Sequence, residues 1–179
     1  QSDRAAQKHA AGAAVVQVEV RGKFEPKFTV YADNKIYRGR PGYHIVQPFR
    51  LEGGKFVLVN RGWVVAGASR DQLPEIRTPA GEITLSGVRL PRFAMAYVPP
   101  GFENPSKPQG RVWQNVTREQ FSDWSGLALE PFVIEQHSAA SDGLARDWPQ
   151  ADFGAEKSES YALQWYGLAA LSVILFLVL

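Results

Sequence analysis

Apolar and polar residues alternate along several short stretches of this chain. Val16, Val18 and Val20 are separated by polar side chains, and a period of two with β-branched residues is typical of a half-buried β-strand. Similar runs rich in β-branched and aromatic residues predict further strands over 28–31, 43–51, 55–65, 82–90 and 131–135. Because the third and fourth of these six stretches are joined by a glycine-centred link at 52–55, we expect them to form a hairpin.

One helix and one long loop interrupt this pattern. Thr117 is a good N-cap and Glu119 follows in the first turn, so we expect a helix over 117–124. Residues 97–110 contain four prolines in 14 residues, which predicts a long loop. These elements indicate an α+β fold: a mostly antiparallel β-sheet with short helices.

The end of the chain has a different character. Residues 161–179 are 19 almost wholly apolar residues, which as a helix would span roughly 28 Å, about one hydrocarbon core. Trp165 and Tyr166 lie near its start, where amphipathic rings favour a membrane interface. We therefore expect a C-terminal transmembrane helix. Since the first residue is Gln1 and not Met, we expect the natural N-terminus to precede it, with either a signal peptide or an earlier membrane span there. The predicted layout is a juxtamembrane linker (1–14), a β-rich domain (15–136), a connector (137–160) and the transmembrane helix (161–179).

Composition narrows the classes of function. The chain has 20 basic and 18 acidic residues, a formal net charge of +2, which argues against a nucleic-acid partner. Cysteine is absent, which excludes disulfides, thiolate zinc sites, iron–sulfur clusters and a cysteine nucleophile. With 45% hydrophobic residues, the chain has ample material for one buried core.

The sequence offers little support for catalysis. Its three histidines, His9, His44 and His137, are not spaced as zinc ligands, so we expect no metal site. The chain also lacks the Gly-x-Ser-x-Gly elbow of α/β-hydrolases and the phosphate-binding P-loop. An enzyme acting on a small molecule would have to use His44, Asp123 and Arg61, whose spacing does not mark them as a constellation.

Two other segments carry candidate binding residues. Arg61 follows an apolar run and precedes Trp63, so its guanidinium can bind the carboxylate of a partner or stack on that indole. The alternative, which we favour on physical grounds, is an internal salt bridge that ends the strand. Trp113, Gln114 and Asn115 follow the long loop, and either tie it to the domain or form a recognition surface.

Four motifs in a fixed order resemble those of the surfeit-locus-one family, in its bacterial branch. They are GYHIVQPFRL (42–51), VLVNRGWV (57–64), RVWQN (111–115) and YALQWYGLAAL (161–171). Members of that family assist the assembly of haem–copper terminal oxidases. The resemblance implies a non-catalytic assembly factor or accessory subunit that binds subunits of a cytochrome c or quinol oxidase and contacts membrane lipid. It also implies two membrane helices, with the domain between them on the periplasmic side of a bacterial inner membrane.

The resemblance also implies candidate site residues. Some members are reported to bind haem, and a family histidine falls at the position of Ser158 here, a poor axial ligand, which makes haem a doubtful cofactor. The candidate partner-binding residues are Arg61, Trp63, Trp113, Gln114, Asn115, Trp165, Tyr166 and Gly167. The alternatives are a generic membrane-tethered binding module and a small-molecule enzyme unrelated to an oxidase.

Overall fold

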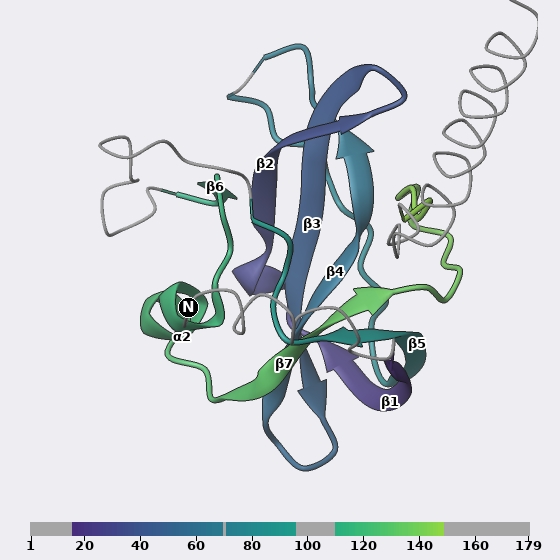
Figure 1. Ribbon diagram of the computed structural model, residues 1–179, viewed down its shortest axis with the longest axis vertical. Coiled ribbons are helices and arrows are strands. Elements are labelled where there is room, and N and C mark those ends of the chain that lie inside the picture. Colours follow the sequence, from purple (N-terminus) through teal and green to yellow (C-terminus); the bar gives the residue numbers. More distant parts are fainter. Residues whose placement is uncertain (1–15, 70, 96–109, 149–179) are drawn as a thin grey trace, which may run out of the picture. The chain divides into compact units, whose positions relative to one another are not determined.

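The computed structural model describes residues 16–69, 71–95 and 110–148 (Figure 1). The strands are β1 (Val16–Phe24), β2 (Val30–Tyr37), β3 (Arg40–Leu51), β4 (Phe56–Val65), β5 (Ile83–Leu90), β6 (Val112–Trp113) and β7 (Leu129–Gln136). The helices are a 3₁₀ turn, η2 (Pro26–Phe28), and the α-helix α2 (Arg118–Ser125). Residues Ala14–Arg146 form one compact unit.

The predicted fold class was wrong. We expected an α+β domain with a transmembrane helix, but the described residues form mostly β-sheet with a single α-helix of eight residues. None of the helices within 16–69, 71–95 and 110–148 is long and apolar enough to cross a membrane. The domain is β-rich because the alternating stretches all form strands, whereas only the Thr117 cap starts an α-helix. The segment 161–179, the linker 1–14 and most of the loop 97–110 lie outside the described residues.

Most individual strand predictions are confirmed. The alternating stretch from Val16 forms β1, and the stretches predicted at 43–51, 55–65, 82–90 and 131–135 form β3, β4, β5 and β7. The start of β2 was wrong, because Pro26 opens the 3₁₀ turn η2 and the strand begins only at Val30. The two-residue strand β6 was not predicted.

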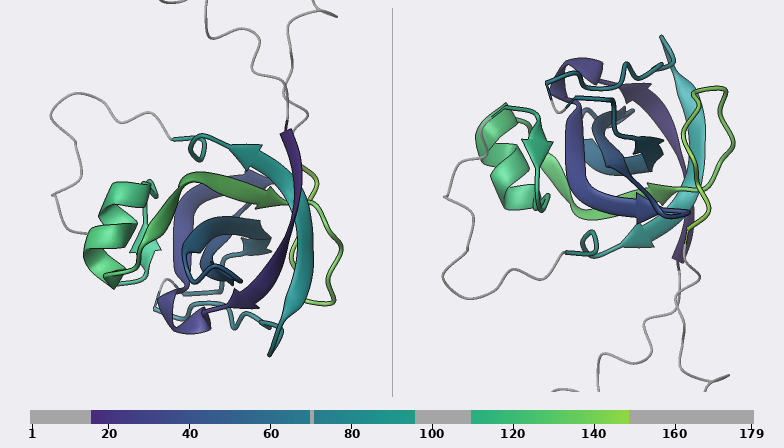
Figure 2. Two further views of the ribbon diagram at one scale, coloured as in Figure 1. Left: turned by 90° about the horizontal axis from the view of Figure 1, so that it is seen from below. Right: turned by 90° about the horizontal axis from the view of Figure 1, so that it is seen from above.

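The sheet closes on itself to form a barrel. Its hydrogen-bonded order is β1-β5-β7-β4-β3, and β1 also pairs with β3 through Gly22 opposite Leu51 and Phe24 opposite Phe49. The closing strand β3 has 12 residues, so it pairs with β1 near one end and with β2 along the other. Pairing is antiparallel except between β4 and β7 and between β2 and β6. Figure 2 shows the strands curving around a common centre, as in small five-stranded Greek-key barrels.

Apolar residues fill the barrel and cover one side of it. The interior cluster joins all five barrel strands and consists of Phe24, Phe49, Val57, Val59, Leu85 and Ile134. Leu58, whose side chain points to the opposite face of β4, belongs to a second cluster with Trp113 and Phe121. The helix α2 packs on that outer face, where Phe121 is fully buried. A third cluster, at the β2–β3 end of the sheet, contains Tyr31, Tyr43, Ile45 and Leu144.

The predicted helix start is confirmed. The Thr117 hydroxyl accepts a hydrogen bond from the backbone N–H of Gln120, which satisfies one of the free donors at the helix N-terminus. The helix ends at Gly126, whose φ of 71° lies in the left-handed region that glycine tolerates.

Candidate functional site

The most unusual side chain of the domain is Arg61, which lies inside the barrel. Val57 and Val59 point inward from β4, and Arg61 continues the same alternation. Its side chain is fully buried, and its guanidinium carbon lies 4.7 Å from the centre of the Phe24 ring. Arg61 therefore borders the apolar interior cluster and must find its polar partners there.

A β-bulge sets the position of Arg61. The pairing of β3 with β4 shifts between His44 opposite Trp63 and Val46 opposite Asn60, so β4 has one extra residue at this point. Gly62 has a φ of 134°, and a Cβ there would lie 2.6 Å from the carbonyl oxygen of Ala145. Gly62 of the VLVNRGWV motif therefore allows both the backbone conformation after Arg61 and the close approach of the segment around Ala145.

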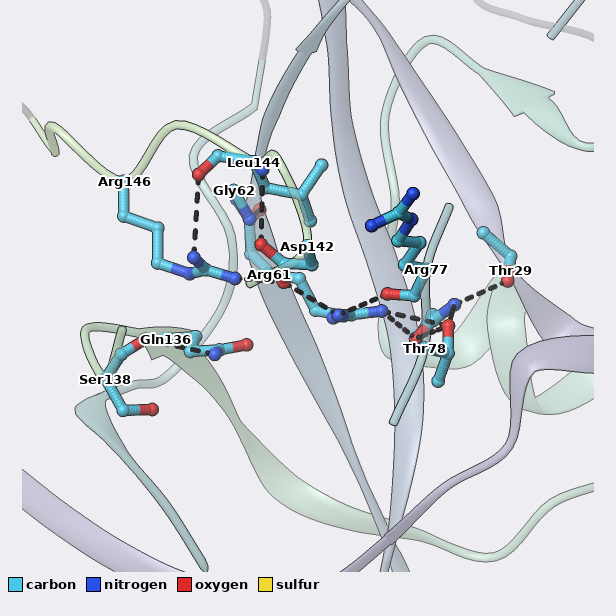
Figure 3. Close-up of polar contacts among 12 residues, drawn as sticks. Thr29, Arg61, Gly62, Arg77, Thr78, Gln136, Ser138, Asp142, Leu144 and Arg146 are labelled. Carbon is cyan, nitrogen blue, oxygen red and sulfur yellow. Dashed lines mark hydrogen bonds and ion pairs between the residues drawn. The ribbon is translucent and has the colours of Figure 1, made fainter. Parts of the chain in front are cut away.

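Four hydrogen bonds hold the Arg61 guanidinium (Figure 3). Nη1 donates to Gln47 Oε1 at 2.8 Å and to Thr78 Oγ1 at 3.0 Å. Nη2 donates to the Arg77 carbonyl at 3.0 Å and to Asp142 Oδ2 at 2.8 Å. The segment around Thr78 and the segment around Asp142 are thereby fastened to the barrel by one side chain.

Asp142 joins two arginines. Its Oδ2 also accepts a hydrogen bond from Arg146 Nη2, and its Oδ1 accepts one from the backbone N–H of Leu144. Next to it, Ala145 exchanges two backbone hydrogen bonds of 2.8 Å with Trp63 of β4. On the other side of Arg61, Gln47 Nε2 donates to Thr29 Oγ1 at 2.8 Å. We call the set Thr29, Gln47, Arg61, Thr78, Asp142 and Arg146 the Arg61 network.

The Arg61 network contains two cations and one carboxylate in a nearly dry environment. The side chains of Arg61, Asp142 and Arg146 are 0%, 3% and 11% exposed. Burial lowers the pKa of Arg61 from its ordinary value, and the adjacent Asp142 carboxylate opposes that effect. Within the described part of the chain, Nε of Arg61 and Nε of Arg146 have no hydrogen-bond partner. The guanidinium stays charged, so Asp142 is essential to its burial.

The interpretation of Arg61 as an internal salt bridge is confirmed, but two details were wrong. Strand β4 continues past Arg61 to Val65, so the salt bridge does not end the strand. The guanidinium lies over Phe24 and not over Trp63. Because Arg61 is fully buried, its side chain is not at the surface where a partner would bind.

The two tryptophan candidates of the described domain are also largely internal. Trp63 is 9% exposed, and its indole Nε1 donates to the Lys35 carbonyl at 2.9 Å. Trp113 is 1% exposed and lies 5.9 Å from Phe121 between ring centres. The structure thus places Trp113 where it ties the end of the long loop to the core.

The remaining candidate residues fall into two groups. Gln114 and Asn115 are half-buried directly after β6 and stay candidates for partner contact. Trp165, Tyr166, Gly167 and Ser158 lie outside the described residues.

The three residues of the enzyme alternative lie on different elements. His44 is on β3, Arg61 is inside the barrel on β4, and Asp123 is on α2. Nδ1 of His44 lies 3.1 Å from Nδ2 of Asn60. Burial, and to a lesser degree Lys35, lower the pKa of His44 to about 4, so the ring is neutral at pH 7 and Nδ1 accepts from the amide. His44 and Arg61 therefore contact different partners.

Among the described residues, no group of three or more His, Asp or Glu side chains is arranged to hold a metal ion. His44 uses one ring nitrogen for Asn60, and His137 Nε2 lies 3.1 Å from Glu135 Oε1. Position 158, where the family resemblance would place a haem ligand, lies outside the described residues.

Sequence reasoning missed most of the Arg61 network. Asp142 lies in the predicted connector 137–160, 81 residues after its partner Arg61, and was not among the candidate site residues. Gln47 carried a signal that was available: a polar side chain at an inward-facing strand position, two residues before the buried Phe49. Such a residue predicts a buried polar partner, which Arg61 supplies.

Comparison with known proteins agrees with the resemblance noted in the motifs. The sequence model of the SURF1 family matches residues 1–170. A SURF1-like protein of Rickettsia bellii is 28% identical over 174 residues, which are 89% of this chain and 66% of that protein. A SURF1-like protein of Rickettsia felis is 26% identical over 176 residues, which are 90% of this chain and 72% of that protein. A SURF1-like protein of Caenorhabditis elegans is 23% identical over 170 residues, which are 89% of this chain and 50% of that protein. This chain thus spans between 50% and 72% of the length of these relatives, and it belongs to the SURF1 family.

Proposed function

We propose that this chain is a non-catalytic assembly factor or accessory subunit of a membrane haem–copper terminal oxidase, and that it acts by binding oxidase subunits. Membership of the SURF1 family supports this proposal, because the family as a whole is known for cytochrome oxidase assembly. Co-purification identifies the partner subunits and shows whether the chain leaves the oxidase after assembly.

One observation from the structure carries the non-catalytic part of the proposal. Asn60, Arg61 and Trp63 are the residues of the VLVNRGWV motif with polar side-chain groups. Each of these groups is hydrogen-bonded to another part of the same domain. A reactive arginine would present its guanidinium to a substrate, whereas the four hydrogen bonds of the Arg61 guanidinium all go to groups of the same domain. The motif therefore supports a rigid scaffold, and we place oxidase binding on the outer surface of that scaffold.

The proposal includes a location at the periplasmic face of a bacterial inner membrane, where the domain would meet an oxidase. Cell fractionation followed by protease treatment of intact spheroplasts tests that location independently. Digestion of the domain only after the membrane is opened would contradict it.

The main experiment is affinity purification of the tagged full-length chain in mild detergent, followed by mass spectrometry. Stoichiometric oxidase subunits would indicate an accessory subunit, and trace oxidase together with haem-synthesis or copper-delivery proteins would indicate an assembly factor. Deleting the gene is expected to lower the amount of assembled oxidase. Normal oxidase content in the deletion strain, with no oxidase subunit in the eluate, would overturn the proposal.

Two substitutions separate binding from catalysis. His44→Gln and Asp123→Asn remove the side chains that an enzyme would need, and neither is expected to lower oxidase content. A folded His44→Gln or Asp123→Asn protein that restores no oxidase in the deletion strain would contradict the non-catalytic assignment. The unchanged chain, expressed from the same promoter, is the reference.

A further inference from the structure

The turn between β2 and β3 carries the most exposed large apolar side chain of the described domain. Ile36 is 76% exposed, compared with 53% for Met95 and 48% for Val16. It lies near the tip of the hairpin, at the end of β3 opposite the β3–β4 turn (Figure 1). An isoleucine exposed to this degree gains free energy when any apolar phase covers it.

Basic residues are close to this isoleucine in the chain: Lys35 and Arg40 lie on the other face of the hairpin, where Arg40 pairs with Tyr37, while Ile36 pairs with Pro41. Lys35, Arg38 and Arg40 lie within six residues of one another, and β3 contains no acidic residue. In β2 the one acid is Asp33, whose carboxylate accepts a hydrogen bond from the backbone of Asn34. The hairpin tip thus combines one apolar side chain with an excess of positive charge.

The tip is rigid. Arg38 and Gly39 have φ values of 49° and 75°, the positive pair typical of a tight two-residue hairpin turn. Behind the turn, the Tyr37 ring lies 5.1 Å from that of Trp63, whose indole donates to the Lys35 carbonyl. Because the strands at the tip are fixed, little conformational entropy is lost when the tip binds.

We propose that the β2–β3 tip (residues 35–40) docks on an anionic phospholipid surface, with Ile36 among the headgroups and its basic neighbours beside lipid phosphates. A narrow convex turn buries little area against a rigid protein, whereas a lipid interface adapts its shape to it. Exposed apolar groups flanked by Lys and Arg are the combination that binds such interfaces. This inference concerns lipid contact alone and does not depend on the oxidase proposal.

Because the chain has no cysteine, a single introduced cysteine gives a clean fluorescent label. The test uses the full chain with Ile36→Cys, labelled with an environment-sensitive dye and mixed with lipid vesicles. Vesicles of phosphatidylcholine mixed with phosphatidylglycerol are expected to shift the emission to shorter wavelength. Pure phosphatidylcholine vesicles and soluble glycerophosphoglycerol are expected to leave it unchanged. The reference label is Gly53→Cys in the β3–β4 turn, where an added Cβ meets no atom within 4 Å.

A matched pair of charge variants tests the role of the basic residues. Arg38→Gln with Arg40→Gln is expected to weaken the response at position 36 by about fivefold for each cation removed. Lys23→Gln with Lys55→Gln removes the same charge outside the β2–β3 tip and is expected to leave the response unchanged.

Three results would overturn the proposal. They are an equal shift at positions 36 and 53, a shift that does not depend on lipid charge, and an unchanged response after the Arg38 and Arg40 substitutions. If the emission of the label at position 36 changes with neither vesicle type but shifts on addition of purified oxidase, the tip binds a protein and not lipid. Failure of the oxidase co-purification would leave the vesicle result untouched.

Discussion

Replacing Asp142 by alanine is expected to destabilise the domain more than replacing Arg61 by methionine. Both changes remove the 2.8 Å contact between Arg61 Nη2 and Asp142 Oδ2. Asp142→Ala leaves the buried cations of Arg61 and Arg146 without the carboxylate that they share. Arg61→Met instead leaves Asp142 paired with Arg146 and places an apolar side chain over Phe24. The two substitutions therefore differ in the charge that they leave behind.

The magnitudes follow from burial. Removing one partner of a buried ion pair costs about 3–5 kcal/mol, so we expect the free energy of unfolding to fall by about 4 kcal/mol for Asp142→Ala. Arg61→Met leaves the Arg77 carbonyl without its hydrogen bond from Arg61, and an unsatisfied buried polar group costs about 1–3 kcal/mol. We expect about 2 kcal/mol for that variant. Arg146→Met keeps the Arg61–Asp142 pair intact and is expected to cost about 1 kcal/mol.

Urea unfolding of the full chain in mild detergent, followed by tryptophan fluorescence, measures these differences. Trp63 and Trp113 are buried, so their emission reports on the loss of the folded domain. The matched control is the surface pair of Arg21 and Glu82, whose side chains are 63% and 61% exposed at 3.4 Å. Glu82→Ala is expected to cost less than about 1 kcal/mol, because exposed ion pairs contribute little.

The expected order of cost is Asp142→Ala, then Arg61→Met, then Arg146→Met. An Asp142→Ala protein as stable as the Glu82→Ala control would refute the argument that the carboxylate neutralises two buried cations. If Asp142→Ala does not fold at all, the relative stability of Arg61→Met and Arg146→Met still shows which arginine is the main partner of Asp142. An Arg146→Met protein less stable than Arg61→Met would show that Arg146 and not Arg61 is the main partner of Asp142.

Three further predictions test other parts of the structure. Gly62→Ala is expected to lower the free energy of unfolding by about 2–3 kcal/mol in urea, because its Cβ would lie 2.6 Å from the Ala145 oxygen at a φ of 134°; Gly53→Ala, in open space, is the control and should cost under about 1 kcal/mol. The pKa of His44 is about 4 in the folded state and 6.5 in an unfolded chain, so the contribution of the neutral ring to the free energy of unfolding is complete above pH 6.5 and is lost as the pH falls through 4. The free energy of unfolding, measured from pH 7 to 4, should therefore fall less steeply in His44→Gln. An unchanged slope would contradict the lowered pKa. Trp113→Ala is expected to cost about 3–5 kcal/mol in the same unfolding assay because the ring is 1% exposed, and a loss under about 1 kcal/mol would mean that the ring does not belong to the core.

The strands could be predicted from the sequence because each carries its own signal. The alternation at Val16, Val18 and Val20 depends on residues that are neighbours in the chain, and so does the Thr117 cap of the helix. The start of β2 was wrong because Pro26 imposes a 3₁₀ turn on a stretch whose composition favours a strand. Strand β6, with two residues, is too short to show a period at all.

The site could be predicted only in part, because its contacts join distant segments. An arginine after Val57, Leu58 and Val59 predicts an internal salt bridge at the end of the strand, and the burial of Arg61 inside the barrel was not predicted. Its partner Asp142 looks like an ordinary residue of a polar connector, and nothing near it in the sequence shows that it lies inside the fold. The inward position of Arg61 depends on closure of the barrel, which pairs β1 with β3 and cannot be read from either strand by itself.

The place of β7 in the barrel has a consequence for how the chain folds. This strand lies between β4 and β5, parallel to one and antiparallel to the other, although it is the last strand of the described residues. A chain synthesised only as far as α2 therefore has two unpaired sheet edges, which are templates for aggregation. Long-range pairings of this kind slow folding, so closure must wait for residues Leu129–Gln136 and is the step at which a nascent chain most needs protection by chaperones.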